Sequence, residues 1–129
     1  MARTVDDVEL YLRSLDRQYV RDGEAFVLAS GLEETSIGLL VHDPLVLVRV
    51  DIGTAPTDSV RQVALFRRLL ELNGEDLIHS SYSLEGDQIS LGAGLRLENL
   101  DMNEVASVLS EVDLALARHA RPLRALARG

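Results

Sequence analysis

The segment LLELNGEDLIHSSYSLEGDQISLGAGLRLENLD, residues 69–101, decides the fold because it holds a helix end, a hairpin and a helix start. Asn73-Gly74 is a common left-handed stop for the apolar helix that precedes it. Apolar and polar residues then alternate over 78–97, which predicts two strands joined at Glu85-Gly86-Asp87-Gln88. Asp101, followed by a glutamate three residues later, predicts the cap of a last helix.

The N-terminal region predicts a helix that leads into a strand. Thr4 and Asp7 resemble a capping box, and an apolar stripe then predicts a helix over about residues 5–17. The same stripe extends to Tyr19. Arg21-Asp22-Gly23 is interpreted as the turn into the first strand.

Three apolar runs predict strands before the second helix. They lie at about 24–30, 36–41 and 45–52. The connection His42-Asp43-Pro44 is too short for a parallel crossover, so the last two strands should be antiparallel. Residues 45–48 are apolar without alternation, which predicts that both faces of the sheet are covered there. The fold class predicted is α+β, with an antiparallel five-stranded sheet and three helices in the order α-β-β-β-α-β-β-α.

The second helix, which begins after Pro56, has more apolar surface than one contact needs. Its apolar residues cover about half of the helix circumference. Two interpretations remain open: the helix lies deep in its own domain, or it also packs against a second subunit. In the second interpretation the dimer contact comes from Val63, Phe66, Leu69 and Leu70.

Composition bounds the class of protein. The chain has 129 residues, 47% of them hydrophobic, which predicts one core and a single domain over residues 1–129. It contains no cysteine, so disulfides, thiolate metal ligands and a cysteine nucleophile are excluded. The net charge of −8 disfavours nucleic acid as a partner. The acidic first ten residues do not fit a signal peptide, and no apolar run is long enough to span a membrane, so we expect a cytoplasmic protein.

No group of residues predicts a catalytic or metal site. His42, His79 and His119 lack the spacing that places two imidazoles on one helical face. His42-Asp43 is better explained as a turn than as a base with its orienting carboxylate. We therefore expect no enzymatic activity, no metal and no cofactor. The alternative, an enzyme, requires His42 or His79 to converge with an acid and a nucleophile in one cleft.

Three segments, together with the order of elements, carry a resemblance to a known family. They are Leu69 to Asn73, Tyr82 to Asp87 and Leu95 to Asp101. They resemble the type III secretion chaperone-like fold, in particular the CesT (Tir chaperone) and YbjN families, and the resemblance covers most of the chain. It implies a cytoplasmic homodimer that binds a segment of another protein and catalyses no reaction.

The resemblance also implies where a client would lie. Chaperones of this kind hold a client segment against apolar patches, so the candidate contacts are the apolar strand residues Leu39, Leu40, Val46 and Val48. Some of these four must belong to the core. The YbjN family shares the fold but is associated with regulation. The alternative function is therefore a regulatory domain that acts through a protein partner in signalling or stress response.

Overall fold

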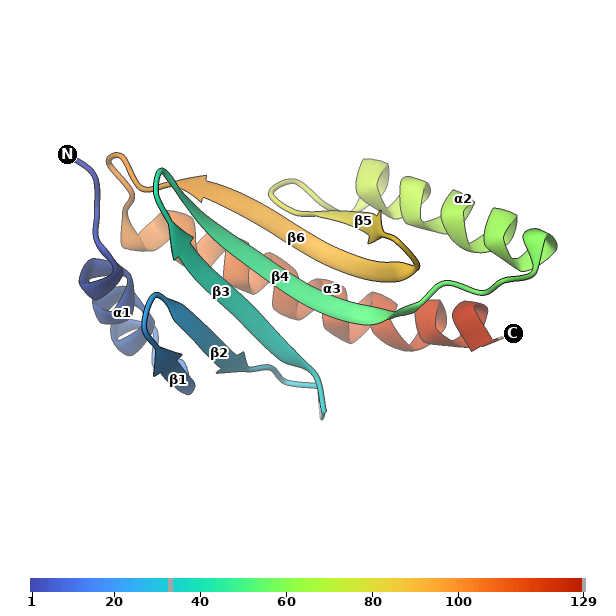
Figure 1. Ribbon diagram of the computed structural model, residues 1–129, viewed down its shortest axis with the longest axis horizontal. Helices are drawn as coiled ribbons and strands as arrows, with labels where there is room; N and C mark the ends of the chain where they lie inside the picture. The colour runs from blue at the N-terminus through green and yellow to red at the C-terminus, as the bar shows by residue number, and fades with distance from the viewer. Residues whose placement is uncertain (33, 129) are drawn as a thin grey trace.

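The computed structural model describes residues 1–32 and 34–128, which form one antiparallel sheet and three helices (Figure 1). In chain order the elements are α1 (Val5–Ser14), β1 (Tyr19–Asp22), β2 (Ala25–Ala29), β3 (Ser36–His42), β4 (Leu45–Thr54), α2 (Ser59–Glu75), β5 (Ser81–Glu85), β6 (Gln88–Arg96) and α3 (Met102–Arg128). The strands of the described residues lie in the order β1-β2-β3-β4-β6-β5, and all neighbours are antiparallel. The predicted α+β class is confirmed.

The predicted five-stranded sheet gains a sixth strand at its N-terminal edge. α1 ends at Ser14 rather than near residue 17, and Asp16 has a left-handed backbone with φ 56° that a helix cannot contain. Tyr19–Asp22, predicted as the end of a helical stripe and a turn, instead pair with β2. The turn lies at Gly23, whose φ is 62°.

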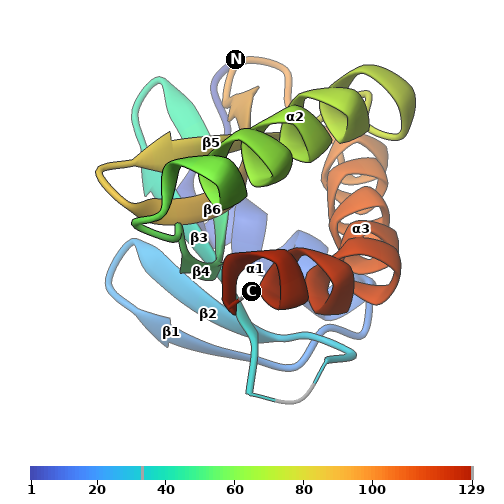
Figure 2. The same cartoon turned by 90° about the vertical axis from the view of Figure 1, so that its right-hand side faces the viewer.

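The helices cover one face of the sheet, which we call the inner face, and leave the outer face bare (Figures 1 and 2). α1 and α3 pack on the inner face, whereas α2 lies beside β5 and contacts α3. Alternate residues of β4 point inward: Val46, Val48, Val50 and Ile52 are between 0% and 4% exposed. Burial of each such side chain contributes about 1.5–3 kcal/mol. The core therefore lies between the inner face and the three helices, since α2 also contributes the buried Leu65, Leu69 and Leu72.

α2 continues past the predicted stop at Asn73-Gly74. The helix ends at Glu75, and its C-cap, Asp76, keeps a right-handed backbone. The Asn73 side chain instead joins α2 to β5, because its Oδ1 accepts from the Tyr82 N–H at 2.7 Å and its Nδ2 donates to the Tyr82 carbonyl at 3.1 Å. The predicted start is correct, since the Asp58 side chain caps α2.

Both predicted hairpins are present. β3 and β4 pair so that Leu40 lies opposite Leu47, and β5 turns into β6 at Gly86, where φ is 57°. The last helix begins directly after the predicted cap at Asp101. α3 continues through Pro122 to Arg128, and its end is held by Arg124, which donates to the Ile52 carbonyl and to Thr35 Oγ1, both at 2.9 Å. Gly129 lies outside the described residues.

Candidate protein-binding surfaces

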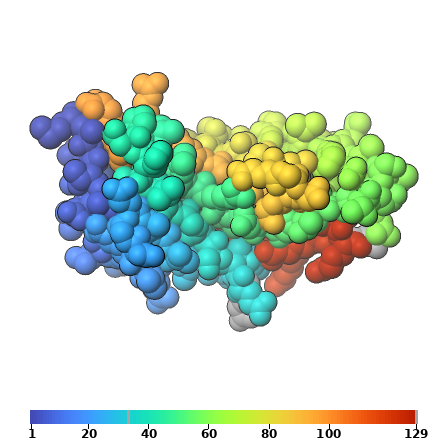
Figure 3. Space-filling view, viewed as in Figure 1, coloured from blue at the N-terminus to red at the C-terminus, as the bar shows by residue number. Residues whose placement is uncertain are grey.

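The outer face of the sheet carries neighbouring exposed apolar side chains across β1 to β4, on the side seen in Figure 3. Leu40 and Leu47 form a cross-strand pair and are 42% and 39% exposed. Val20 and Val27 form a second pair and are 72% and 53% exposed. The prediction that both faces are covered at residues 45–48 is therefore wrong, because Leu47 faces solvent. We call Val20, Val27, Leu40 and Leu47 the outer patch.

Glycines hollow the outer face beside this patch. Gly38 stands between Val27 and Arg49 in one cross-strand row, and Gly92 continues the row on β6. A hollow of about 420 Å³ includes Val27, Gly38, Arg49 and Asp51 in its lining. Arg49 Nε donates to Asp51 Oδ1 at 3.0 Å, so a polar pair borders the apolar side chains. The surface offers bare backbone and apolar side chains next to each other.

The two edges of the sheet differ in their access to another strand. At the β5 edge, the Asn73 side chain occupies the backbone N–H and carbonyl of Tyr82. At the β1 edge, the Ala29 N–H donates to the Gln18 carbonyl. Hydrogen-bonded and non-hydrogen-bonded pairs alternate in an antiparallel ladder, so from this pair onward every second residue of β1 bonds to β2. The backbone groups of Tyr19 and Arg21 consequently point away from β2. The β1 edge is therefore the better site for an added strand.

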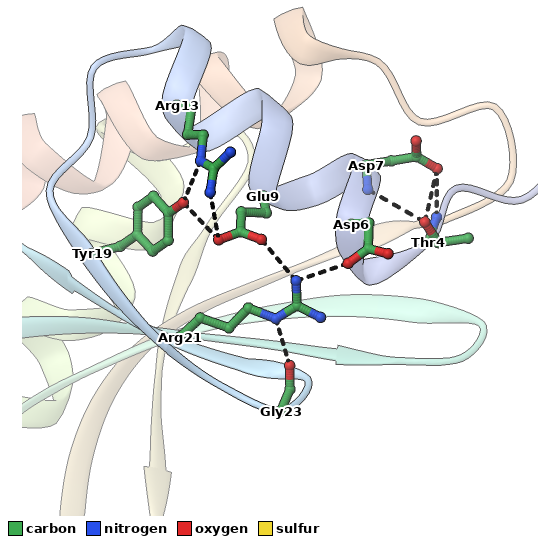
Figure 4. Close-up of polar contacts among 8 residues, drawn as sticks. All are labelled: Thr4, Asp6, Asp7, Glu9, Arg13, Tyr19, Arg21 and Gly23. Atoms are coloured by element: carbon green, nitrogen blue, oxygen red, sulfur yellow. Dashed lines mark hydrogen bonds and ion pairs between the residues drawn. The ribbon is translucent and has the colours of Figure 1, made fainter.

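A network of side chains fixes β1 to α1 (Figure 4). Arg21 Nη1 donates to Asp6 at 2.8 Å and to Glu9 at 2.7 Å, and the Tyr19 hydroxyl donates to the other Glu9 oxygen at 2.7 Å. Arg13 Nε donates to the Tyr19 hydroxyl at 3.0 Å. Hydrogen bonds from Tyr19 and Arg21 hold the pKa of Glu9 below its ordinary value. β1 is thus held by its inner side chains while its backbone edge stays open.

The residues predicted for a dimer contact divide between core and surface. Val63 and Leu70 are 67% and 71% exposed, and Val60 continues their stripe at 75%. Phe66 is half-buried against the core, and Leu69 is 5% exposed. Leu69 therefore packs within its own chain, because it lies on the side of α2 opposite the exposed stripe.

The residues predicted as client contacts divide in the same way. Leu39, Val46 and Val48 are between 1% and 3% exposed, since they point to the inner face. Leu40 alone of the four lies on the outer face. Sequence reasoning missed Val20, Val27 and Leu47, although the period of two along each strand could have separated the faces once one residue was placed.

Hydrogen bonds among Tyr82, His119 and Asp76 join α2, β5 and α3, and of these three residues Tyr82 and His119 are buried. The Tyr82 hydroxyl lies 2.9 Å from His119 Nδ1, and His119 Nε2 lies 2.8 Å from Asp76 Oδ2. Burial, with the Asp76 charge, raises the pKa of Tyr82 far above its ordinary range, so its hydroxyl stays protonated beside Nδ1. On the other side of the ring, the Asp76 carboxylate accepts from His119 Nε2. These hydrogen bonds satisfy the buried polar groups of Tyr82 and His119.

The other two histidines form no such arrangement. His42 is exposed at the end of β3, and His79 is exposed after α2. His79 shares a pocket with His119, but His42 does not line it. In residues 1–32 and 34–128, no group of three histidine or acidic side chains could hold a metal ion.

The order of elements and the antiparallel sheet give the chain the secretion chaperone-like fold. Over 93% of this chain and 99% of the other, the structure is similar to one from the Yersinia pestis type III secretion chaperone SycH in complex with a stable fragment of YscM2, with a TM-score of 0.61 and 15% identity. It is also similar to a chain of the heterodimeric ExoU–SpcU complex from the type III secretion system of Pseudomonas aeruginosa (TM-score 0.64, 12% identity, 90% and 96% covered). E. coli YbjN gives a TM-score of 0.61 at 13% identity, with 91% and 94% covered.

The chain belongs to the family CesT_Tir_1, whose model matches residues 1–129. The predicted resemblance to the CesT and YbjN families is confirmed. None of the curated proteins compared with the chain matches it. In the described part of the chain, no helix has the length and hydrophobicity needed to span a bilayer.

Proposed function

We propose that this chain is a non-enzymatic protein-binding module, a cytoplasmic chaperone or adaptor of the secretion type that works as a homodimer and holds a segment of a client protein. The observation that carries the proposal is the outer patch. Four exposed apolar side chains on a bare sheet face contribute little to the stability of the chain alone. Such a surface is typical of a site for another protein.

The geometry of the outer patch suits an extended client segment. A strand added at the β1 edge would bond to the free backbone groups of Tyr19 and Arg21, and alternate side chains of that strand would reach Val20. The client would then continue over Leu40 and Leu47. Of the predicted contacts, Leu40 is retained, whereas Leu39, Val46 and Val48 act by supporting the sheet from the inner face.

The exposed stripe of α2 supports the homodimer. Val60, Val63 and Leu70 lie on one side of the helix and are each at least 67% exposed. Arginines gather in the first two thirds of α2 and Glu71 and Glu75 in its last third. An antiparallel pair would therefore bring the basic part of each helix toward the acidic part of the other, and would oppose the helix dipoles favourably.

The client-binding proposal is tested by affinity capture from native cells. Tagged wild-type protein and the variant Leu40→Asp/Leu47→Asp are compared by quantitative mass spectrometry. We expect one protein to be enriched at least tenfold on the wild type and lost on the variant, because a carboxylate on the outer face must be desolvated to bind. Leu10→Asp is the matched control, because Leu10 is 56% exposed on α1. Equal capture by all three proteins would contradict the proposal.

The dimer is tested by light scattering at tens of micromolar. The wild type is expected at about 28 kDa, twice the chain mass of 14.2 kDa. Val63→Asp/Leu70→Asp should return the mass to that of one chain, whereas Leu10→Asp should not. A wild-type mass equal to that of one chain would contradict the proposed homodimer.

The similarity to YbjN supports a second candidate, a regulatory domain that acts through a protein partner in signalling or stress response. Both candidates bind protein, so the identity of the captured partner distinguishes them. A secreted protein as partner favours the chaperone, and a partner from a stress or signalling pathway favours the regulator.

A further inference from the structure

The loop between α2 and β5, residues 76–80, is held against α3 at both ends. At one end the Asp76 carboxylate pairs with His119 of α3 at 2.8 Å. At the other end a single carboxylate of α3, Glu111, accepts the backbone N–H groups of Ile78, His79 and Ser80, the last two at 2.8 and 2.9 Å. The Ser80 hydroxyl donates to the same carboxylate at 3.0 Å. The backbone of this loop is therefore fixed by α3.

The charge on Glu111 matches this role. Burial raises the pKa of the Glu111 carboxyl, but the hydrogen bonds from Ile78, His79 and Ser80 outweigh it and hold the pKa below its ordinary value. Glu111 is thus ionised at neutral pH and accepts all four bonds. A loop whose backbone is bound in this way loses little backbone entropy when a partner binds.

This fixed loop displays an apolar side chain to solvent. Ile78 is 88% exposed, and Leu114, which faces the same pocket from α3, is 54% exposed. Leu77 and Ala115 complete the apolar part of that pocket, whose volume is about 360 Å³. Neither exposed side chain stabilises the chain alone. A rigid backbone beneath exposed apolar groups is the arrangement that a binding site requires.

The pocket continues along α3 toward its N-terminus. A second hollow of about 220 Å³ shares His79 and Ser107 with the first and is lined at its far end by Asp101 and Glu104. We call the two hollows together the α3 groove. Its carboxylates are Asp76, Glu111, Asp101 and Glu104, whereas Arg118 is its one arginine among the described lining residues. The groove is therefore acidic on balance, and its arginine lies at the end away from Asp101 and Glu104, which also cap α3.

We propose that the α3 groove is a second docking surface, separate from the outer patch, and that its occupant is an extended peptide segment in which an apolar side chain is followed within a few positions by arginine or lysine. The apolar side chain enters between Ile78 and Leu114, and the basic side chain lies near Asp101 and Glu104. The proposal rests on the proposed protein-binding function, which it extends to a second site with its own chemistry.

The test is a selection of random twelve-residue peptides displayed on phage, with the full-length wild-type chain as the target. Enriched peptides are then measured on three variants: Ile78→Asp/Leu114→Asp, Leu40→Asp/Leu47→Asp, and the control Leu10→Asp. We expect one group of peptides that shares an apolar residue with a nearby basic residue. Binding of this group should fall at least tenfold on the first variant and stay within twofold of the wild type on the other two.

A second measurement does not depend on the fold of any variant. In synthetic copies of the selected peptides, the basic residue is replaced by glutamate and binding to the wild type is measured by fluorescence anisotropy. We expect at least a tenfold loss, and we expect the parent peptide to weaken as salt rises because the charges are partly exposed. An unchanged affinity of the glutamate peptide would overturn the proposed occupant.

The remaining outcomes separate this inference from the proposed function. Peptides lost only on Leu40→Asp/Leu47→Asp would overturn the α3 groove and leave the outer patch intact. No enrichment on the wild type would contradict both. If light scattering shows that Ile78→Asp/Leu114→Asp dissociates a wild-type dimer, the groove belongs to an interface between copies of this chain, and the peptide proposal is overturned.

Discussion

Adjacent leucines of β3 show how differently the two faces of the sheet are used. Leu39 points inward and is 2% exposed, whereas Leu40 points outward and is 42% exposed. Their partners on β4, Val48 and Leu47, repeat the contrast at 3% and 39%. The inner residues stabilise the fold, and the outer residues remain available to a partner. Chemically similar side chains one position apart therefore serve different purposes.

We expect the largest loss of stability from a substitution on the inner face. Leu39→Ala should lower the free energy of unfolding by about 2–5 kcal/mol, because it removes a buried side chain and leaves a cavity. Leu40→Ala should lower it by less than about 1 kcal/mol, since its side chain is already partly hydrated. Urea unfolding followed by circular dichroism measures both variants. Equal losses would show that the two faces do not differ as described.

A smaller loss of stability should follow when the hydrogen bonds among Tyr82, His119 and Asp76 are broken. His119→Phe leaves the Tyr82 hydroxyl without its hydrogen-bond partner and removes the partner of Asp76, so we expect a loss of about 1–3 kcal/mol in the free energy of unfolding. His79→Phe is the matched control, because His79 is exposed, and it should change stability little. The pair is compared by urea unfolding at neutral pH, and a similar loss in both variants would speak against a structural role for His119.

Glu111 anchors the loop at residues 76–80 through hydrogen bonds to a charged acceptor. Glu111→Gln weakens these bonds and should lower the free energy of unfolding by about 1–2 kcal/mol. Its pH dependence follows from the lowered pKa of Glu111. The stabilising contribution should be fully present above the ordinary pKa of 4.5 and should be lost as the pH falls through the lower value in the folded state. Unfolding measured across acidic pH should therefore show the wild type and Glu111→Gln converging at low pH. A constant difference at every pH would contradict this origin.

The smallest effect is expected on the outer face. Val20→Thr should change the free energy of unfolding by no more than about 0.5 kcal/mol, because Val20 is 72% exposed and threonine keeps the preference for a strand. The same substitution should weaken client binding if the client passes over β1. Thermal unfolding and capture efficiency are measured on the same preparation. A clear loss of stability would mean that the outer face contributes to the fold.

The sequence predicted those elements whose evidence is local. The β5–β6 hairpin follows from alternating residues on either side of Gly86, and α3 follows from the cap at Asp101. β1 was missed because Tyr19 continues the helical spacing of the residues before it. What fixes Tyr19 in a strand is its bond to Glu9 and the pairing with β2, and both depend on the chain having already turned back.

The surfaces were harder to predict than the fold. An apolar run such as residues 45–48 does not predict which face of the sheet will be covered, because that depends on where α1 and α3 pack. The Tyr82–His119–Asp76 chain joins residues 37 and 43 positions apart, beyond the reach of any local pattern. Asn73 was assigned to a helix stop by its type, whereas its side chain holds the edge of β5.

Site-specific photocrosslinking shows whether a client segment lies on the outer patch. The photoreactive amino acid p-benzoylphenylalanine is placed at position 40 on the outer face or at position 10 on α1, and the native cells are irradiated. The account predicts a light-dependent adduct between position 40 and one other protein, with little at position 10. An equal adduct from both positions, or a client adduct from position 10 alone, would contradict it.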